Sequence, residues 1–131
     1  MEKTSNQPRL LLVDDHQDTL TLQAILLRRE GFDVVTSGDA ETALAQAAEG
    51  KVDLVVSDLR LPDRDGVELM QELHKRYGLY GVALTGAADA GRAADRVDAG
   101  FVEVLIKPVA PEQLVKVIRH ALSEVDNASS Q

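Results

Sequence analysis

The sequence predicts an α/β domain in which a doubly wound, five-stranded parallel sheet carries helices on both faces. Two observations lead to this prediction. Short apolar runs recur five times along the chain, and amphipathic helical patterns separate them. The apolar runs lack polar alternation, which is typical of parallel strands that are buried on both sides. A chain of 131 residues suits one such domain with a single core.

Each expected strand is a short run rich in valine and leucine. The strands alternate strictly with helices, and a parallel crossover needs a dozen or more residues. We therefore expect the strands to run parallel, with the helices packed on both faces of the sheet. The expected strands span residues 10–13, 34–35, 54–56, 82–84 and 102–106.

The first two helices are predicted from spacing and from their ends. Apolar residues from Leu20 to Leu27 follow the three-and-four spacing of an amphipathic helix, which ends at Gly31. A second helix is expected at 40–48, because capping residues precede it and Gly50 follows it.

Three further helices are expected after the third strand. The helix at 67–77 carries a stripe of large apolar residues. The helix at 88–99 is rich in alanine and contains Gly91, so its propensity is weaker. The last helix spans 111–125, with Pro111 in the first turn, where its missing N–H costs nothing.

Composition limits the functions that remain open. The net charge of −8 argues against nucleic acid as a direct partner, because phosphate binding depends on clustered Lys and Arg. No apolar run approaches the length of a membrane span, and the chain lacks cysteine. Residues 1–8 and 126–131 are polar tails, and the domain is expected at 9–125. We expect a cytoplasmic protein.

Polar residues follow the expected strands at the edge where parallel sheets bind ligands. Asp14 and Asp15 follow the first strand, Asp58 the third, Thr85 the fourth and Lys107 the fifth. Three carboxylates at one edge repel one another unless a cation lies between them. Oxygen ligands without cysteine favour Mg²⁺ over zinc.

The same residues suit phosphoryl transfer to an aspartate. Lys107 alone would be explained as a counter-ion of the acidic cluster, but Thr85 adds a hydroxyl donor. With these groups present, Asp58 is placed to attack phosphorus while the cations and the hydroxyl stabilise charge on the phosphoryl oxygens. Asp15 and Asp58 are expected to bind the metal directly and Asp14 through water.

Four stretches of the chain resemble the receiver domain of two-component response regulators. They are "LLVDD", "DLVVSDLRLPDRDG", "ALTG" and "AGFVEVLIKPV", in the order typical of that family. The resemblance covers Arg9 to Leu122. It implies the flavodoxin-like (CheY-like) fold with strand order 2-1-3-4-5. The words "ALTG" and "AGF" are also similar to receivers of the hybrid histidine kinase type.

The resemblance assigns roles to the acidic residues. It implies that Asp58 is the phosphoacceptor and that Asp14 and Asp15 form the acidic pair that binds Mg²⁺. The backbone carbonyl of Arg60, two residues after the acceptor, is implied as a further metal ligand. A side chain at this position can overhang the phosphoryl group, so the Arg60 side chain is expected either to do so or to lie in solvent as a surface arginine.

It also assigns roles to residues of the fourth and fifth strands. Thr85 is implied to bond a phosphoryl oxygen, and Lys107 to pair with the phosphoryl group through a cis bond to Pro108. Most receivers carry an aromatic residue three places before this lysine, and here Val104 takes that place. The usual inward movement of an aromatic ring is therefore not expected.

The function implied is phosphorelay signal transduction. A histidine kinase or histidine phosphotransfer protein would donate the phosphoryl group, and the chain would catalyse only its own phosphorylation and dephosphorylation. A homodimer is left open. One alternative is a phosphorylation-independent scaffold. The other is a small-molecule aspartyl phosphatase, which needs a second acid where Arg60 stands.

Overall fold

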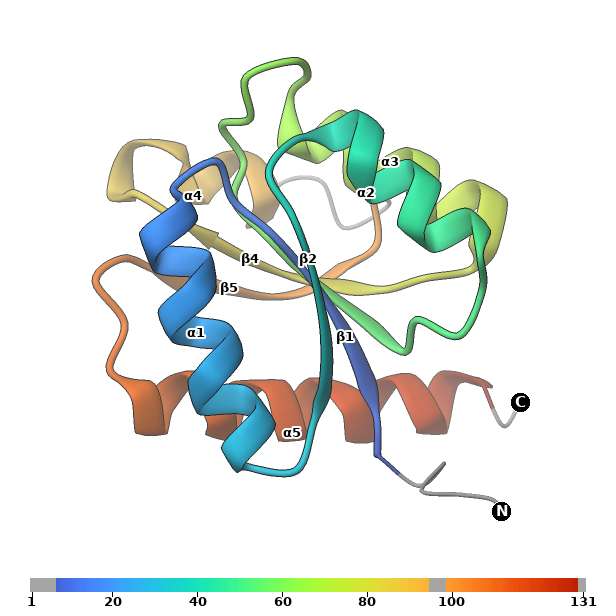
Figure 1. The fold of residues 1–131 in the computed structure, drawn as a ribbon. Helices are drawn as coiled ribbons and strands as arrows, with labels where there is room; N and C mark the ends of the chain where they lie inside the picture. The colour runs from blue at the N-terminus through green and yellow to red at the C-terminus, as the bar shows by residue number, and fades with distance from the viewer. Residues whose placement is uncertain (1–6, 95–98, 130–131) are drawn as a thin grey trace.

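The computed structural model describes residues 7–94 and 99–129, and these residues form five strands and five helices that alternate along the chain (Figure 1). The five strands form one parallel sheet in the order β2-β1-β3-β4-β5, which confirms the predicted fold and strand order. The elements are β1 (Arg9–Val13), α1 (Gln17–Arg29), β2 (Asp33–Ser37), α2 (Ala40–Ala48), β3 (Leu54–Ser57), α3 (Gly66–Tyr77), β4 (Gly81–Thr85), α4 (Ala87–Ala94), β5 (Phe101–Ile106) and α5 (Pro111–Ser129).

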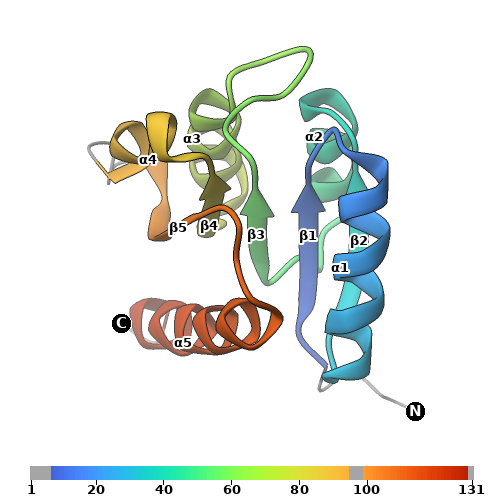
Figure 2. The same ribbon diagram turned by 90° about the vertical axis from the view of Figure 1, so that its left-hand side faces the viewer.

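The sheet divides the core into two layers because successive strand residues point to opposite faces. Leu10 and Leu12 of β1 pack with buried residues of α1 and α5. Leu11 and Val13 pack with buried residues of α2, α3 and α4. Both sets are apolar, which explains why the sequence of this central strand shows no alternation. The two views in Figures 1 and 2 show the helices on either side of the sheet.

The strand ends define one functional edge of the molecule. Figure 2 shows β1 and β3 side by side with their arrowheads toward the same end of the sheet. Parallel pairing places Val13 of β1 opposite Ser57 of β3, in matched register. The residues that follow these two strands therefore begin at the same height above the sheet.

Several boundaries differ from the sequence-based expectation. β2 runs from Asp33 to Ser37 rather than over 34–35, because pairing with β1 extends through its polar ends. α5 continues past Val125 to Ser129, so residues 126–129 extend the helix rather than form a tail. No glycine or proline interrupts that stretch, so its sequence is compatible with a continued helix.

Other expected residues fall outside the described part of the chain. The fourth helix was expected at 88–99, and α4 is described over Ala87–Ala94, while residues 95–98 are not described. Residues 1–6 and 130–131 of the expected tails are likewise not described. Among the described helices we find no segment with the length and hydropathy that crossing a bilayer demands.

Candidate functional site

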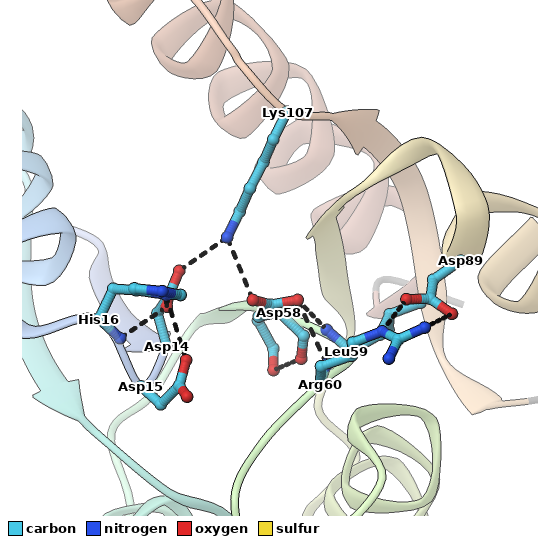
Figure 3. Close-up of polar contacts among 9 residues, drawn as sticks. Asp14, Asp15, His16, Asp58, Leu59, Arg60, Asp89 and Lys107 are labelled. Carbon is cyan, nitrogen blue, oxygen red and sulfur yellow. Dashed lines mark hydrogen bonds and ion pairs between the residues drawn. The ribbon is translucent and has the colours of Figure 1, made fainter.

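Lys107 joins the carboxylates that follow β1 and β3. Its Nζ donates to Asp14 Oδ2 at 3.0 Å and to Asp58 Oδ2 at 3.1 Å. Figure 3 shows the Lys107 ammonium between these two side chains. The backbone N–H of Lys107 donates to the carbonyl of Thr85 at 2.8 Å, which holds the end of β5 beside the end of β4. Four of the predicted site residues thus come together at one edge of the sheet.

Asp14 is a buried carboxylate, with 4% of its side chain exposed. Burial raises its pKa, but the backbone N–H of His16 and the Lys107 ammonium oppose this effect, and the pKa lies below the usual 3.8. For Lys107, desolvation lowers the pKa while its hydrogen bonds with Asp14 and Asp58 raise it, with a net increase above 10.5. The charged form of this pair is therefore favoured at neutral pH.

Asp15 lies at the solvent side of the acidic pair. Its carboxylate is partly exposed, and Nδ1 of His16 lies 3.2 Å from Oδ1 of Asp15 and 3.2 Å from Oδ1 of Asp14. Oxygen or nitrogen atoms of these three residues lie within 4.8 Å of one another, so they form a cluster of possible metal ligands. The hard carboxylate oxygens of the pair fit Mg²⁺, which prefers oxygen ligands.

Asp58 is held in one orientation by its own loop. Its Oδ1 accepts from the backbone N–H of Leu59 at 2.6 Å and of Arg60 at 3.2 Å, while Oδ2 faces Lys107. About 11% of the Asp58 side chain is exposed. Asp58 is therefore largely buried at the same edge of the sheet, and Lys107 links it to Asp14 of the acidic pair.

Thr85 contributes a hydroxyl group without a partner. The residue is buried, and within residues 7–94 and 99–129 its Oγ1 finds no hydrogen-bond partner. A buried, unsatisfied hydroxyl costs free energy unless a ligand satisfies it. Thr85 ends β4, next to β3, so this hydroxyl is suited to bond an anion at the carboxyl edge of the sheet.

The response regulator receiver domain family matches residues 10–119 of this sequence. The chain belongs to this family. The receiver is 32% identical over 123 residues to the DNA-binding response regulator MtrA of Mycolicibacterium paratuberculosis, and the match covers 94% of the receiver and 55% of MtrA. It is also 32% identical over 128 residues to PhoP of Bacillus subtilis, the alkaline phosphatase synthesis transcriptional regulatory protein, with coverage of 94% and 52%.

Solved structures give the same result for the receiver. The crystal structure of a CheY-like receiver domain protein from Methanospirillum hungatei superimposes with a TM-score of 0.86 at 31% identity, covering 94% of this chain and 99% of that one. The receiver spans about half the length of the curated relatives. Receivers of response regulators are regulatory domains of two-component systems, as the sequence predicted.

The receiver shows one feature that was expected from the resemblance and one that departs from it. The peptide bond between Lys107 and Pro108 is cis. Val104 takes the place of the aromatic residue and is half-buried against the core layer that contains α3 and Phe101. A valine side chain in that position cannot make the ring movement of other receivers.

The Arg60 side chain does not overhang Asp58 in this receiver. Its guanidinium lies against Asp89 of α4, with Nε 2.5 Å from Oδ2 and Nη2 3.4 Å from Oδ1 (Figure 3). Asp89 also contacts Arg92, which pairs in turn with Asp65 of the β3–α3 loop. Two ion pairs therefore connect this loop to α4.

Sequence reasoning missed two residues at the edges of the site. His16 contacts both members of the acidic pair, and its position directly after them was the available signal. Asp89 is 29 residues from Arg60 and follows no strand, so no spacing in the sequence indicated their contact. Both were found only from the geometry.

Proposed function

We propose that Asp58 accepts a phosphoryl group and that this modification is the input signal of the receiver. The main support for this proposal is the contact of Lys107 with both Asp14 and Asp58. It places a cation next to the position where the oxygens of a phosphoryl group on Asp58 would carry negative charge. The unpartnered Thr85 hydroxyl supports it from the neighbouring strand.

In the proposed step, a carboxylate oxygen of Asp58 attacks the phosphorus of a phosphohistidine. The new O–P bond forms as the N–P bond to the imidazole breaks, and the leaving nitrogen keeps the electron pair and takes up a proton. The backbone N–H groups of Leu59 and Arg60 hold the carboxylate in position. Lys107 and Thr85 stabilise the charge on the transferred group.

Mg²⁺ is the metal proposed for the acidic pair, where it would neutralise charge on the phosphoryl oxygens. Asp14, Asp15 and Asp58 would supply carboxylates, and Arg60 its backbone carbonyl. The water-mediated role of Asp14 stays a prediction, because Asp14 and Asp58 both face Lys107 in this structure.

The donor proposed is a histidine kinase or a histidine phosphotransfer protein, as for other receivers. Self-phosphorylation and dephosphorylation are the only reactions proposed, so the receiver would act as a switch without turnover of a substrate. The relatives are named as DNA-binding or transcriptional regulators, and we propose no nucleic-acid contact for this acidic domain itself. A cytoplasmic location, a hybrid-kinase relationship and a homodimer stay predictions.

Intact-mass measurement after incubation with acetyl phosphate tests the proposal. We expect a single added phosphoryl group in the parent chain with Mg²⁺ and none without Mg²⁺ or in Asp58→Asn. Asp53→Asn is a matched control, because Asp53 precedes β3 at the opposite edge of the sheet and should leave the addition unchanged.

Two results would contradict the proposal. Addition that persists in Asp58→Asn would place the acceptor elsewhere. No addition from either acetyl phosphate or a phosphorylated histidine phosphotransfer protein would favour the phosphorylation-independent scaffold. An aspartyl phosphatase is disfavoured because Arg60, not an acid, stands two residues after Asp58 and pairs with Asp89.

A further inference from the structure

Arg60 lies between two carboxylates that belong to different parts of the receiver. Its backbone N–H donates to Asp58, while its guanidinium pairs with Asp89 in the first turn of α4. Figure 3 shows the Arg60 side chain directed away from Asp58 and toward Asp89. One residue therefore links the proposed phosphoacceptor to the helix that follows β4.

The two members of this ion pair differ strongly in exposure. The Arg60 side chain is 74% exposed, whereas that of Asp89 is 10% exposed. Arg60 also borders an open pocket of about 390 Å³, lined in addition by Arg64 and Arg92, so its guanidinium has space to turn. The exposed Arg60 side chain can therefore change its position at a low cost in free energy. The largely buried Asp89 carboxylate depends on the ion pair to compensate its charge.

Asp89 would lose its main partner if Arg60 turned away. Its other contact is with Nη1 of Arg92 at 3.5 Å, and Arg92 is shared with Asp65. A carboxylate that is shielded from water and loses its counter-ion is strongly disfavoured. The first turn of α4 would then keep the weaker contact with Arg92 and lose the ion pair that ties it to the β3–α3 loop through Arg60.

Phosphorylation of Asp58 would create a competitor for Arg60. A phosphoryl group carries more negative charge than a carboxylate and offers several strong acceptor oxygens, and arginine pairs with such groups in a bidentate manner. Hydrogen bonding and charge from Asp89 raise the pKa of Arg60 most, and the charge of Asp58 also raises it.

We propose that the Arg60–Asp89 ion pair transmits phosphorylation to α4: the guanidinium exchanges Asp89 for the phosphoryl group, and the first turn of α4 rearranges. The inference rests on the proposed function, since it needs the phosphoryl group on Asp58. It supplies a route to α4 in a receiver whose Val104 cannot make the usual ring movement.

Hydrogen exchange of the α4 amides, followed by mass spectrometry, tests this route. In the parent receiver, exchange over 87–94 should become about fivefold faster on phosphorylation, as a change of about 1 kcal/mol in opening free energy would produce. Asp89→Asn should exchange faster before phosphorylation and change little after it. Intact mass measured on the same samples reports the phosphorylated fraction.

Two further variants make the test specific. Arg60→Gln removes an exposed side chain and should speed up amide exchange in α4 as much as Asp89→Asn does. The double variant should exchange no faster than either single variant, because both substitutions remove the same ion pair. Arg64→Gln is the matched control: Arg64 lies on the same loop but pairs with Glu72 of α3, so α4 should respond to phosphorylation as in the parent.

The outcomes separate the inference from the function on which it rests. If the parent receiver is not phosphorylated, the proposed function fails and the inference fails with it. If it is phosphorylated but α4 exchange stays the same, or if Arg60→Gln responds like the parent, the function stands and the ion-pair route is overturned. Circular dichroism of each variant shows whether it is folded. If Asp89→Asn unfolds, amide exchange in Arg60→Gln still tests the ion-pair route.

Discussion

Gly66 lies directly against the backbone that carries the proposed phosphoacceptor. A Cβ atom built at this position would approach the carbonyl oxygen of Asp58 and lie 2.6 Å from Cα of Leu59. Backbone atoms cannot move aside as a flexible side chain can. The N–H of Gly66 also donates to the carbonyl of Leu59 at 2.7 Å. The absence of a side chain at position 66 thus allows α3 to begin next to Asp58.

We predict that Gly66→Ala destabilises the receiver by about 1–3 kcal/mol, the usual cost of forcing a methyl group into packed surroundings. Urea unfolding measures the loss. Gly38→Ala is the matched control, because a Cβ there meets no atom within 4 Å and should change the free energy of unfolding by less than about 0.5 kcal/mol. Equal stability of the two variants would contradict the close approach at Gly66.

The individual site residues could be predicted because topology places them. Asp14, Asp58, Thr85 and Lys107 each end or follow a strand, and parallel strands bring their carboxyl ends to one edge. The direction of a long side chain is not fixed by topology. For Arg60 the sequence left open a position over Asp58 or one in solvent, and it did not indicate the contact with Asp89, since that pairing depends on where α4 lies in space.

At the scale of elements, two carboxylates hold the start of α2. Asp39 caps the helix locally by accepting from the N–H of Thr42 at 2.7 Å. Asp63 reaches the same end from the β3–α3 loop and accepts from the N–H groups of Ala40 and Glu41 at 2.9 and 3.0 Å. These bonds connect the loop after Asp58 to α2.

Asp63 should make the free energy of unfolding of the receiver depend on pH in the acidic range. The hydrogen bond from Ala40 lowers its pKa most, and the bond from Glu41 lowers it further, so the folded pKa lies below 3.8. The contribution of the Asp63 carboxylate to the free energy of unfolding is therefore complete above the pKa that Asp63 has in the unfolded chain. It is lost as the pH falls through the lower pKa that Asp63 has in the folded receiver. We predict that Asp63→Asn costs about 0.5 kcal/mol at pH 7 and less at pH 3, measured by urea unfolding.

The control for this prediction lies at the other end of the same helix. Glu49→Gln removes one negative charge at the C-cap of α2, where a negative charge gains nothing from the helix dipole, and should not destabilise the receiver. An Asp63→Asn loss that is as large at pH 3 as at pH 7 would show that the charge of Asp63 is not responsible.

The order and type of the elements could be predicted from apolar runs and helical spacing, but their ends could not. β2 is extended by Asp33, Thr36 and Ser37, whose strand conformation comes from pairing with β1 rather than from apolar side chains. α5 continues beyond Val125 because the backbone hydrogen bonds of a helix do not depend on apolar side chains. The pattern of apolar residues in the sequence therefore identifies the buried part of each helix or strand, but not its ends.

For the whole molecule, Mg²⁺ should increase stability by relieving repulsion within an already acidic chain of net charge −8. We predict a gain of about 1.4 kcal/mol when free Mg²⁺ is about ten times its dissociation constant. Asp15→Asn should lose most of this gain. Without Mg²⁺ the variant should be at least as stable as the parent, because Asp14 then lacks a neighbouring like charge.

A second acidic group provides the control. Glu103, His120 and Glu124 also bring ligand atoms within 4.8 Å of one another, on β5 and α5. Glu124→Gln should keep the full Mg²⁺ effect on the thermal midpoint. A reduction as large as that in Asp15→Asn would mean that the ion acts on surface carboxylates in general.

The contact between Lys107 and Asp14 has a consequence for synthesis of the protein. The two residues are 93 positions apart, so Asp14 leaves the ribosome long before its ammonium partner exists. Until Lys107 emerges from the ribosome, a buried Asp14 would have no ammonium counter-ion. Asp14 and Asp15 are therefore more stable in contact with water during that time. β1 is thus translated before the other strands of the sheet, yet its charged end reaches its native surroundings only when nearly the whole domain has been made.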